Sequence, residues 1–316
     1  MRYFLILSLI IAGLKGNGQG CSDAGFCTMG AMKPDQPYSK RIDFKLRSLE
    51  FNYYHGKSLL SPVITVYTAD MNFSINSDYT LQIKVPYQTV KGNLGQTAGV
   101  GDLSLSASRG FPLSNGYTAG LTLGAKIATG KSNIENNDTN FGTGGDLPMY
   151  YQLSLGSHDL VLGGSLLNEK WLFATGMQMP MVHRNENDFR WSEWADYPSQ
   201  EGYLLKHALA NDLKRGTDVM LRAERNFRYI NFNFGIGFLA IYRITKDEIY
   251  NFNEDRREKL EGTTGLASNI LVNFGYNFNV NHGIKLIGGL KTTDRDVNPD
   301  GLTRKHVISS SYVYRF

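Results

Sequence analysis

The feature that most constrains the fold is a strict alternation of apolar residues with small or polar residues. In 229–243, Ile230, Phe232, Phe234, Ile236 and Phe238 alternate with Asn231, Asn233, Gly235 and Gly237; 265–278 and 117–130 follow the same pattern. Successive side chains of a strand point to opposite faces, so each stretch has one apolar and one polar face. Such strands are typical of transmembrane β-barrels, which meet lipid outside and water inside. The predicted lumen-facing side chains are those of Asn231, Asn233, Asn269, Asn273, Asn277 and Lys126.

The last stretch of the chain extends this pattern. Ile308, Tyr312, Tyr314 and Phe316 lie two or four residues apart, so on a strand they share one face. An apolar, aromatic face on the final strand is explained if it meets lipid. The tail resembles the terminal strand of bacterial outer-membrane barrels, which the barrel assembly machinery recognises. It therefore predicts an outer-membrane location in a Gram-negative bacterium, with outer-membrane lipid as a partner.

The first residues are typical of an export signal. A basic start at Arg2 precedes an apolar segment at 3–14 and small residues at 16–18. The apolar segment is too short to span a bilayer, so 1–18 is predicted to be a signal peptide. Acylation of Cys21, as in a lipoprotein, is the competing interpretation. Export follows in either case.

Composition and motifs exclude several other classes. The chain of 316 residues has 34 Gly, 18 Tyr and 17 Phe, which favours strands and turns. Beyond the first segment no apolar run reaches the ~18 residues of a membrane-spanning helix. The net charge of +4 is scattered among both signs, so no nucleic-acid partner is expected. No catalytic motif is found, so we expect neither an enzyme nor a cofactor.

Counting the strands predicts an all-β fold, a transmembrane antiparallel β-barrel of about twelve strands formed by residues 43–316. The expected strands are 43–54, 59–75, 79–91, 99–110, 117–130, 159–167, 171–183, 217–227, 229–243, 265–278, 283–293 and 305–316. The long connections 131–158, 184–216, 244–264 and 294–304 then all lie at one end, as in known outer-membrane barrels. A periplasmic solenoid or sandwich is the alternative.

Two regions resemble a known family. The segments GVGDLSL at 99–105, ATGK at 128–131, FGTG at 141–144 and GSHDLVL at 156–162 are similar to the phenol-degradation MetA-pathway transporters, distant relatives of the FadL fatty-acid channels. The resemblance implies a monomeric barrel that passes small hydrophobic molecules and has an N-terminal segment in its lumen. Residues 19–42 are accordingly expected to form a plug, shorter than that of the fatty-acid channels. An insert at 146–155 also departs from the family pattern.

The start of this expected plug contains the chain's two cysteines, Cys21 and Cys27, followed by Met29 and Met32. One interpretation is a disulfide that closes a small loop, contributing about 2–3 kcal/mol through the entropy of the unfolded chain. The other is a soft-metal site, because two thiolates and two thioethers suit Cu(I). The sequence leaves both open.

A weaker metal pattern lies near the end of the chain. Asp296, Asn298 and Asp300 alternate and are followed by Gly301, as in the first half of a calcium loop. The twelfth position, which needs a bidentate Glu, is Val307. A polar turn in an outer loop is the competing interpretation.

Three functions are compatible with these patterns. The first is a passive outer-membrane channel for a small, hydrophobic solute, gated by the N-terminal segment. The second is a barrel that acquires or senses copper through the Cys/Met segment. The third is a barrel that transports nothing and presents its long loops to a partner.

Overall fold

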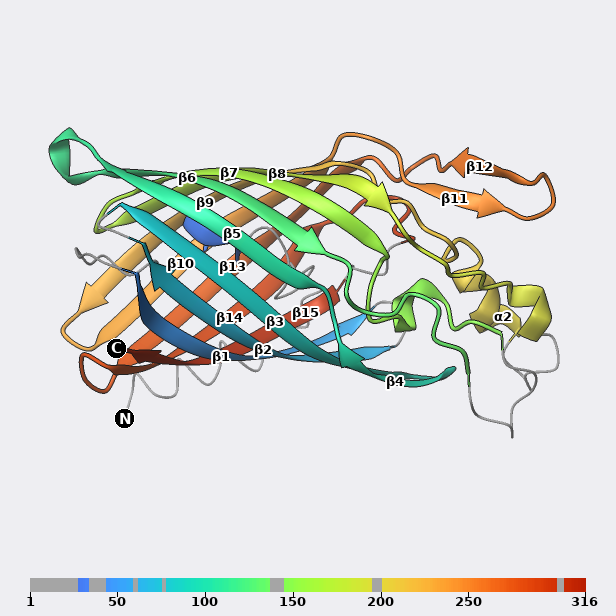
Figure 1. Cartoon of the computed structure of the whole chain (residues 1–316), viewed down its shortest axis with the longest axis horizontal. Helices are drawn as coiled ribbons and strands as arrows, with labels where there is room; N and C mark the ends of the chain where they lie inside the picture. Colours follow the sequence, from blue (N-terminus) through green and yellow to red (C-terminus); the bar gives the residue numbers. More distant parts are fainter. Residues whose placement is uncertain are drawn as a thin grey trace.

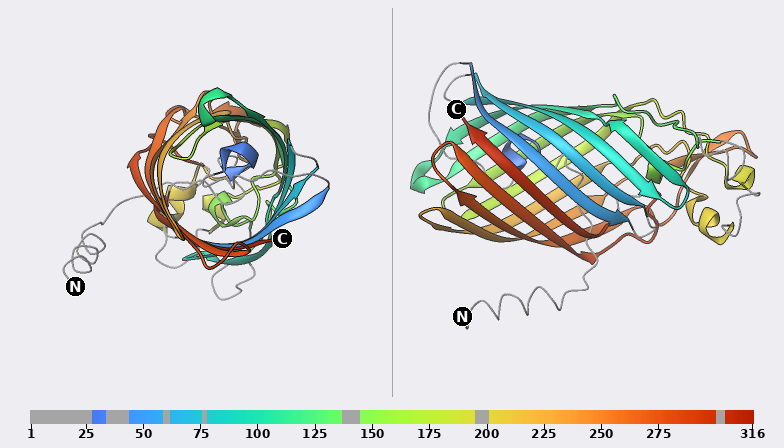
Figure 2. Two further views of the ribbon diagram at one scale, coloured as in Figure 1. Left: turned by 90° about the vertical axis from the view of Figure 1, so that its left-hand side faces the viewer. Right: turned by 90° about the horizontal axis from the view of Figure 1, so that it is seen from below.

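The chain folds into a closed antiparallel barrel of twelve strands (Figures 1 and 2). The computed structural model describes residues 28–33, 44–58, 62–75, 78–136, 145–194, 201–299 and 304–316. The barrel strands are β1 (Lys45–Ser58), β2 (Val63–Ser74), β3 (Tyr79–Gly92), β5 (Leu103–Pro112), β6 (Thr118–Ile127), β7 (Ser157–Leu167), β8 (Trp171–His183), β9 (Asp218–Tyr229), β10 (Phe232–Arg243), β13 (Gly265–Asn277), β14 (His282–Thr293) and β15 (Arg304–Arg315). The predicted fold class and strand number are confirmed.

Each strand pairs with its neighbour along the chain, and the first and last strands close the ring. β1 pairs with β15 antiparallel, with Phe51 opposite Tyr312 and Glu50 opposite Val313. Closure leaves no barrel strand with an unpaired edge, which is the condition for a sheet to cross a membrane.

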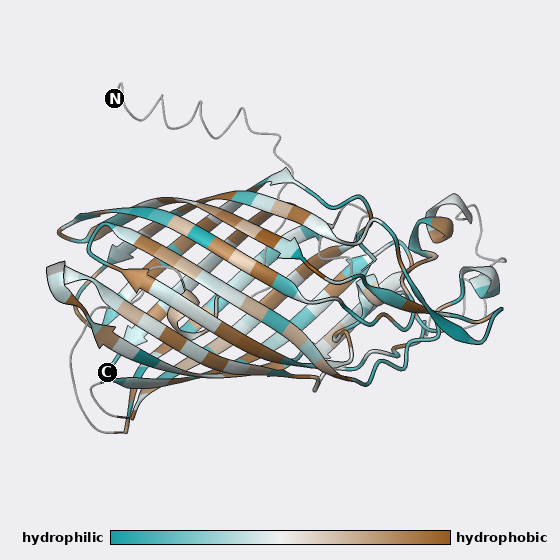
Figure 3. Cartoon of the chain, turned by 90° about the horizontal axis from the view of Figure 1, so that it is seen from above, coloured by the Kyte–Doolittle hydropathy of each residue, from teal (hydrophilic) through white to brown (hydrophobic). Residues whose placement is uncertain are grey.

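The outer face of the barrel is apolar, as the alternation predicted. Large side chains at alternate positions point outward: Leu121 is 60% exposed and Leu123 57% exposed, whereas Thr122 between them is 5% exposed. Further outward residues are Phe51, Leu221, Phe234, Ile236, Phe238, Ile270, Ile308 and Tyr312. Figure 3 shows hydrophobic residues alternating with polar ones along the strands. Exposed apolar surface of this extent and arrangement is suited to lipid.

The two ends of the barrel differ. At one end the strands are joined by short connections, and the C-terminus lies there (Figure 1); we call it the short-turn end. The predicted strands 217–227 and 229–243 place a turn at residue 228, which is wrong: β9 continues to Tyr229, and Ile230 and Asn231 make the turn to β10. The turn shifts because the two strands pair through Phe232 and Tyr229. In bacterial barrels the short turns face the periplasm.

The opposite end, the long-loop end, carries the remaining elements. They are β4 (Gly95–Val100), η4 (Met149–Tyr151), η5 (Trp191–Trp194), α2 (Glu201–Leu204), η6 (Leu205–His207), β11 (Glu248–Asn251) and β12 (Arg256–Lys259), while η3 (Ser114–Gly116) lies in a short turn. Among the described residues no helix is long and apolar enough to cross a membrane. The described part of the predicted long connection 131–158 contains no barrel strand, as expected.

An apolar cluster packs these loops onto the barrel rim. Tyr151, Trp194 and Leu204 from the loops are at most 4% exposed and pack with Tyr54 and Val90 from β1 and β3. The Tyr151 hydroxyl lies 2.8 Å from that of Tyr203, and its backbone carbonyl accepts a hydrogen bond from Thr97 Oγ1 at 2.6 Å. The described parts of these loops therefore form a packed layer on the barrel rim.

Candidate functional site

A short segment near the N-terminus lies inside the barrel. Thr28–Lys33, which includes η2 (Gly30–Met32), packs against β5, β6, β7 and β8 and appears within the ring of strands in Figure 2. We call it the lumen segment. Its backbone is held by the wall: the amide of Gly30 donates to Gln82 Oε1 at 2.8 Å, and that of Ala31 to Thr122 Oγ1 at 2.8 Å. Paired donors of this kind make burial of irregular backbone possible.

Glycines in the wall make room for this segment. A Cβ atom at Gly163 in β7 or at Gly176 in β8 would collide with the sulfur of Met32, and one at Gly120 in β6 would lie 2.8 Å from the Ala31 Cβ. Met32 is fully buried in the resulting notch. The side chain of Met32 thus fills the space that is left in the wall because Gly163 and Gly176 have no side chain.

The last residue of the lumen segment anchors a group of charges. Lys33 Nζ donates to Glu50 Oε2 and to Asp70 Oδ2, both at 2.8 Å. Two further amines approach the same carboxylates: Lys285 Nζ is 3.6 Å from Glu50, and Lys84 Nζ is 3.8 Å from Asp70. We call these five residues the central lysine cluster. Burial alone would lower the pKa of Lys33, but Glu50 and Asp70 outweigh it and hold this pKa above its usual value.

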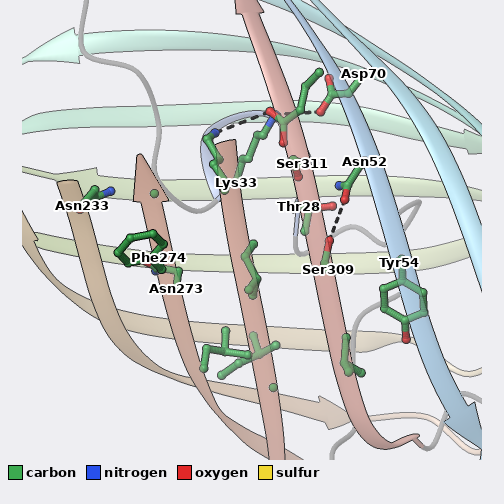
Figure 4. Close-up of a pocket in the computed structure, with 18 of the residues that line it drawn as sticks. Thr28, Lys33, Asn52, Tyr54, Asp70, Asn233, Asn273, Phe274, Ser309 and Ser311 are labelled. Carbon is green, nitrogen blue, oxygen red and sulfur yellow. Dashed lines mark hydrogen bonds and ion pairs between the residues drawn. The ribbon is translucent and has the colours of Figure 1, made fainter. Parts of the chain in front are cut away.

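A cavity lies beside the cluster, on the side of the barrel that the lumen segment does not fill. It holds about 910 Å³ of empty space, partly continuous with solvent. Its walls come from β1, β2, β3, β9, β10, β13, β14, β15 and the lumen segment (Figure 4). The polar lining includes Lys33, Lys84, Lys285, Arg222, Glu50, Asp70, Asn52, Asn233, Asn273, Ser309 and Ser311. We call it the central cavity.

A second cavity, of about 650 Å³, lies towards the short-turn end and shares Asn233, Gly275 and Lys285 with the central cavity. We call it the short-turn cavity. Its lining also includes Arg228 and Arg315, whose positions in β9 and β15 have the inward parity of Asn226 and Val313. The shared wall residues make the two cavities neighbours along one side of the lumen.

The long-loop end contains a different set of ion pairs. Arg243 is 2% exposed and donates to Asp218 at 2.8 and 2.9 Å and to Asp247 at 2.6 and 2.8 Å. Arg215 pairs with Asp218. Arg295 lies 3.7 Å from Asp247. Lys126 lies 3.2 Å from Asp102 and 3.4 Å from Asp159. We call these eight residues the long-loop network.

The residues predicted to face the lumen occupy several places. Asn233 and Asn273 line the central cavity, and Asn273 Nδ2 donates to Glu224 Oε1 at 2.6 Å. Asn269 is fully buried, and Lys126 belongs to the long-loop network. Asn277 lines the short-turn cavity and accepts a hydrogen bond from Arg315 at 3.1 Å. The prediction for Asn231 was wrong, because it lies exposed in the turn after β9.

The predicted metal residues are only partly described. Cys21 and Cys27 lie outside the described residues, so the disulfide and the copper site stay predictions, as does the signal peptide at 1–18. Met29 and Met32 pack in an apolar cluster with Val161, Met220 and Leu271.

The residues of the predicted calcium loop are also only partly described. Asn298 donates through its side chain to the carbonyl of Arg295 at 2.9 Å, and its own carbonyl accepts from Tyr150 at 2.6 Å. Asp300 lies outside the described residues, so calcium binding by Asp296, Asn298 and Asp300 stays a prediction. Within the described part of the chain, no three His, Cys, Asp or Glu side chains are grouped so as to hold a metal ion.

The central lysine cluster itself was not predicted from the sequence. Each member lies in a predicted strand or in the expected plug, and alternation assigns Glu50, Asp70 and Lys84 to the inner face. Their association was hidden because Glu50 and Lys285 are far apart in the sequence. A charged residue on the inner face of a predicted strand was the available signal.

Comparison with known proteins supports the architecture. No family model matches the chain, and no curated protein sequence does either. Among solved structures, an outer membrane channel from Pseudomonas putida F1 superposes with a TM-score of 0.56 at 15% identity, covering 89% of this chain and 99% of that one. The CymD monoaromatic hydrocarbon channel gives a TM-score of 0.43 at 10% identity, covering 96% of this chain and 98% of that one. The KdgM porin gives 0.42 at 8%, covering 85% and 99%.

The first of these likenesses shows a shared fold, whereas the other two are too distant to carry an argument. Together with the closed barrel and its apolar outer face, it places this protein in the outer membrane. The short turns then face the periplasm and the long loops the exterior.

Proposed function

We propose that the protein is a passive channel for small solutes across the outer membrane. The observation that carries the proposal is the central cavity, which lies inside a closed membrane barrel and adjoins the short-turn cavity. Its lining combines apolar side chains with a few polar groups, as is usual for small-molecule sites. A barrel with a structural role alone has no need of two adjoining cavities along its lumen.

The lining of the central cavity supports a solute with an apolar part. Leu239, Leu271 and Ile287 form apolar wall opposite the charged and amide groups. An apolar wall favours the body of an organic solute, and a few polar groups fix its orientation. This division agrees with the hydrophobic solute that the family resemblance implies.

The lumen segment is proposed to be the gate. It occupies one side of the lumen, is joined to the wall by hydrogen bonds and by the ion pairs of Lys33, and belongs to no strand. Its release would widen the passage without breaking any pairing of the barrel. The long loops pack over the other end, so the solute enters between them.

A matched pair of glycine variants tests the gate. Gly163→Leu places a side chain where Met32 sits, whereas Gly164→Leu points to the outer face, where a Cβ meets its neighbours at an ordinary 3.8 Å. The purified full-length protein is reconstituted in planar bilayers and its single-channel conductance is measured. We expect a higher conductance for Gly163→Leu than for wild type, and no change for Gly164→Leu.

The two parts of the proposal can fail separately. If neither wild type nor Gly163→Leu conducts ions or small organic solutes, the channel function is wrong. If wild type conducts and Gly163→Leu conducts equally, the channel remains and the gate is wrong. Heat-modifiable migration on a gel confirms that each variant is folded.

A further inference from the structure

We propose that two arginines on the outer face of the barrel, Arg109 in β5 and Arg225 in β9, bind the phosphate groups of phospholipids in the periplasmic leaflet. These two sites are separate from the lumen, and they would bind lipid whether or not the barrel conducts a solute. The same arrangement of a cation and two aromatic rings forms each of them.

At the first site, Arg109 is in contact with two aromatic rings. It stands opposite Tyr79, the first residue of β3, and Phe111 follows two positions later on β5. The Arg109 Cζ atom is 5.1 Å from the centre of the Tyr79 ring and 4.8 Å from that of the Phe111 ring. Ser108 beside it faces the lumen and is 9% exposed, so Arg109 points outward.

The second site repeats this arrangement. Arg225 stands opposite Trp171, the first residue of β8, and Phe227 follows two positions later on β9. The Arg225 Cζ atom is 5.0 Å from the Trp171 ring and 5.4 Å from the Phe227 ring. Glu224 and Asn226 on either side are buried, so Arg225 points outward. Both arginines are therefore held by cation–π contacts on the lipid-facing surface.

Both sites lie at the short-turn end, where the outer face carries many aromatic side chains. Exposed aromatic residues at this end include Tyr79, Trp171, Phe227, Phe232, Phe278 and Phe316. Girdles of aromatic residues mark the level of the membrane–water interface. Since the short turns face the periplasm, Arg109 and Arg225 lie at the head-group level of the periplasmic leaflet. This leaflet consists of phospholipids, whose phosphate groups lie at the same level.

The two guanidinium groups have aromatic neighbours but no hydrogen-bond acceptor from the protein. Within the described part of the chain, neither Arg109 nor Arg225 makes a hydrogen bond or an ion pair. A cation–π contact orients the guanidinium and leaves it positively charged. An unpaired cation at a lipid-facing surface is costly, whereas a phosphate neutralises it and accepts two parallel N–H bonds. A phospholipid therefore supplies the partner that the barrel lacks.

Native mass spectrometry of the purified full-length protein in detergent tests the proposal. The protein is mixed with dioleoylphosphatidylglycerol or with dioleoylglycerol, which has the same chains and no phosphate. We expect wild type to retain the phosphatidylglycerol. Arg225→Gln should roughly halve the number of molecules bound, because one of the two arginine–phosphate sites remains. The double variant Arg109→Gln/Arg225→Gln should abolish the preference for phosphatidylglycerol.

The matched control is Arg228→Gln. It removes the same charge from the same strand, at a residue that lines the short-turn cavity inside the barrel. The control should therefore retain as much phosphatidylglycerol as wild type. Heat-modifiable migration on a gel confirms that each variant is folded.

The fluorescence of Trp171 shows where the lipid binds. The protein is placed in phosphatidylcholine vesicles that contain a small fraction of phosphatidylglycerol brominated on its chains. Subtracting the emission of Trp171→Phe isolates that of Trp171. We expect stronger quenching than with the same fraction of brominated phosphatidylcholine, whose phosphate is accompanied by its own cation. Arg225→Gln should lose this difference, and Arg225→Lys, which keeps the charge, should retain part of it.

Three results would overturn the proposal. The first is equal retention of the two lipids by wild type. The second is a preference that survives in the double variant or falls equally in Arg228→Gln. The third is displacement of phosphatidylglycerol by sodium phosphate at equal concentration, which would show that the sites take free phosphate and are not lipid sites.

Discussion

Two groups of ion pairs inside the barrel differ in how their charged groups are combined and in whether they border a cavity. In the long-loop network, Lys126, Arg215, Arg243 and Arg295 meet Asp102, Asp159, Asp218 and Asp247, so positive and negative groups are equal in number. In the central lysine cluster, three amines share two carboxylates beside a cavity. The first group binds loops to the barrel, whereas the second borders a cavity.

The comparison also indicates that the buried charges have different roles in the long-loop network and in the central lysine cluster. Arg243 donates to two carboxylates through different N–H groups of its guanidinium: Nε and Nη2 donate to Asp218 of β9, and Nη1 donates to Asp247 of the loop after β10. This geometry fixes the loop to the strand. The central cluster instead leaves its amines at the edge of empty space. We therefore expect the first network to matter more for stability than the second.

The largest effect is expected from breaking the long-loop network. Arg243→Met leaves the buried carboxylates of Asp218 and Asp247 without their main partner, which should lower the free energy of unfolding by about 3–5 kcal/mol. Denaturant titration of the protein in detergent micelles measures it. Arg225→Met, which removes an outward arginine, should cost far less. Equal losses in the two variants would contradict a structural role for the network.

A smaller effect is expected at the long-loop end as the pH falls. His207 is fully buried against Tyr150 and Tyr203, and neither ring nitrogen has a hydrogen-bond partner among the described residues. Burial lowers its pKa from the usual 6.5 to about 4. Its neutral form therefore stabilises the folded loops above pH 6.5, and this stability is lost as the pH falls from 6.5 towards 4. The loss is about 3 kcal/mol at most.

Hydrogen exchange of the loops as a function of pH measures this loss. His207→Phe keeps the aromatic contacts and should abolish the loosening between pH 6.5 and 4. Burial raises the pKa of Asp146 to about 6. The folded form therefore takes up this proton at a higher pH than the unfolded form does. A falling pH thus favours the folded state through Asp146, which is opposite to the effect of His207. A His207→Phe variant whose loops loosen as much as those of wild type between pH 7 and 4.5 would contradict the role of His207.

The smallest change in stability is expected from the central lysine cluster. Lys285→Gln removes a 3.6 Å pair with Glu50, which keeps its 2.8 Å pair with Lys33. The free energy of unfolding should change by less than about 1 kcal/mol. The same denaturant titration applies. A loss comparable to that of Arg243→Met would show that the cluster is structural, and the contrast between the two regions would disappear.

The sequence predicted the barrel well and its interior less well. Alternation places Leu121 and Leu123 outside and Thr122 inside without knowledge of any partner, because the two faces of a strand differ strictly by parity. Where a turn interrupts a strand, the alternation no longer predicts the face on which a residue lies, as at Asn231. The notch for Met32 could not be predicted, since Gly163 and Gly176 alternate like any other small inner residues and their partner lies more than 100 positions away.

The sequence by itself determined the all-β class, the twelve strands, the lipid-facing residues and the end at which the long loops lie. These follow from local periodicity, which needs only neighbouring residues to be recognised. The tertiary structure alone decided which inner charges meet. Barrel closure brings Glu50 of β1 within reach of Lys285 of β14, and the lumen segment adds Lys33 to them. Such contacts join residues that are remote in the chain, so no local pattern specifies them.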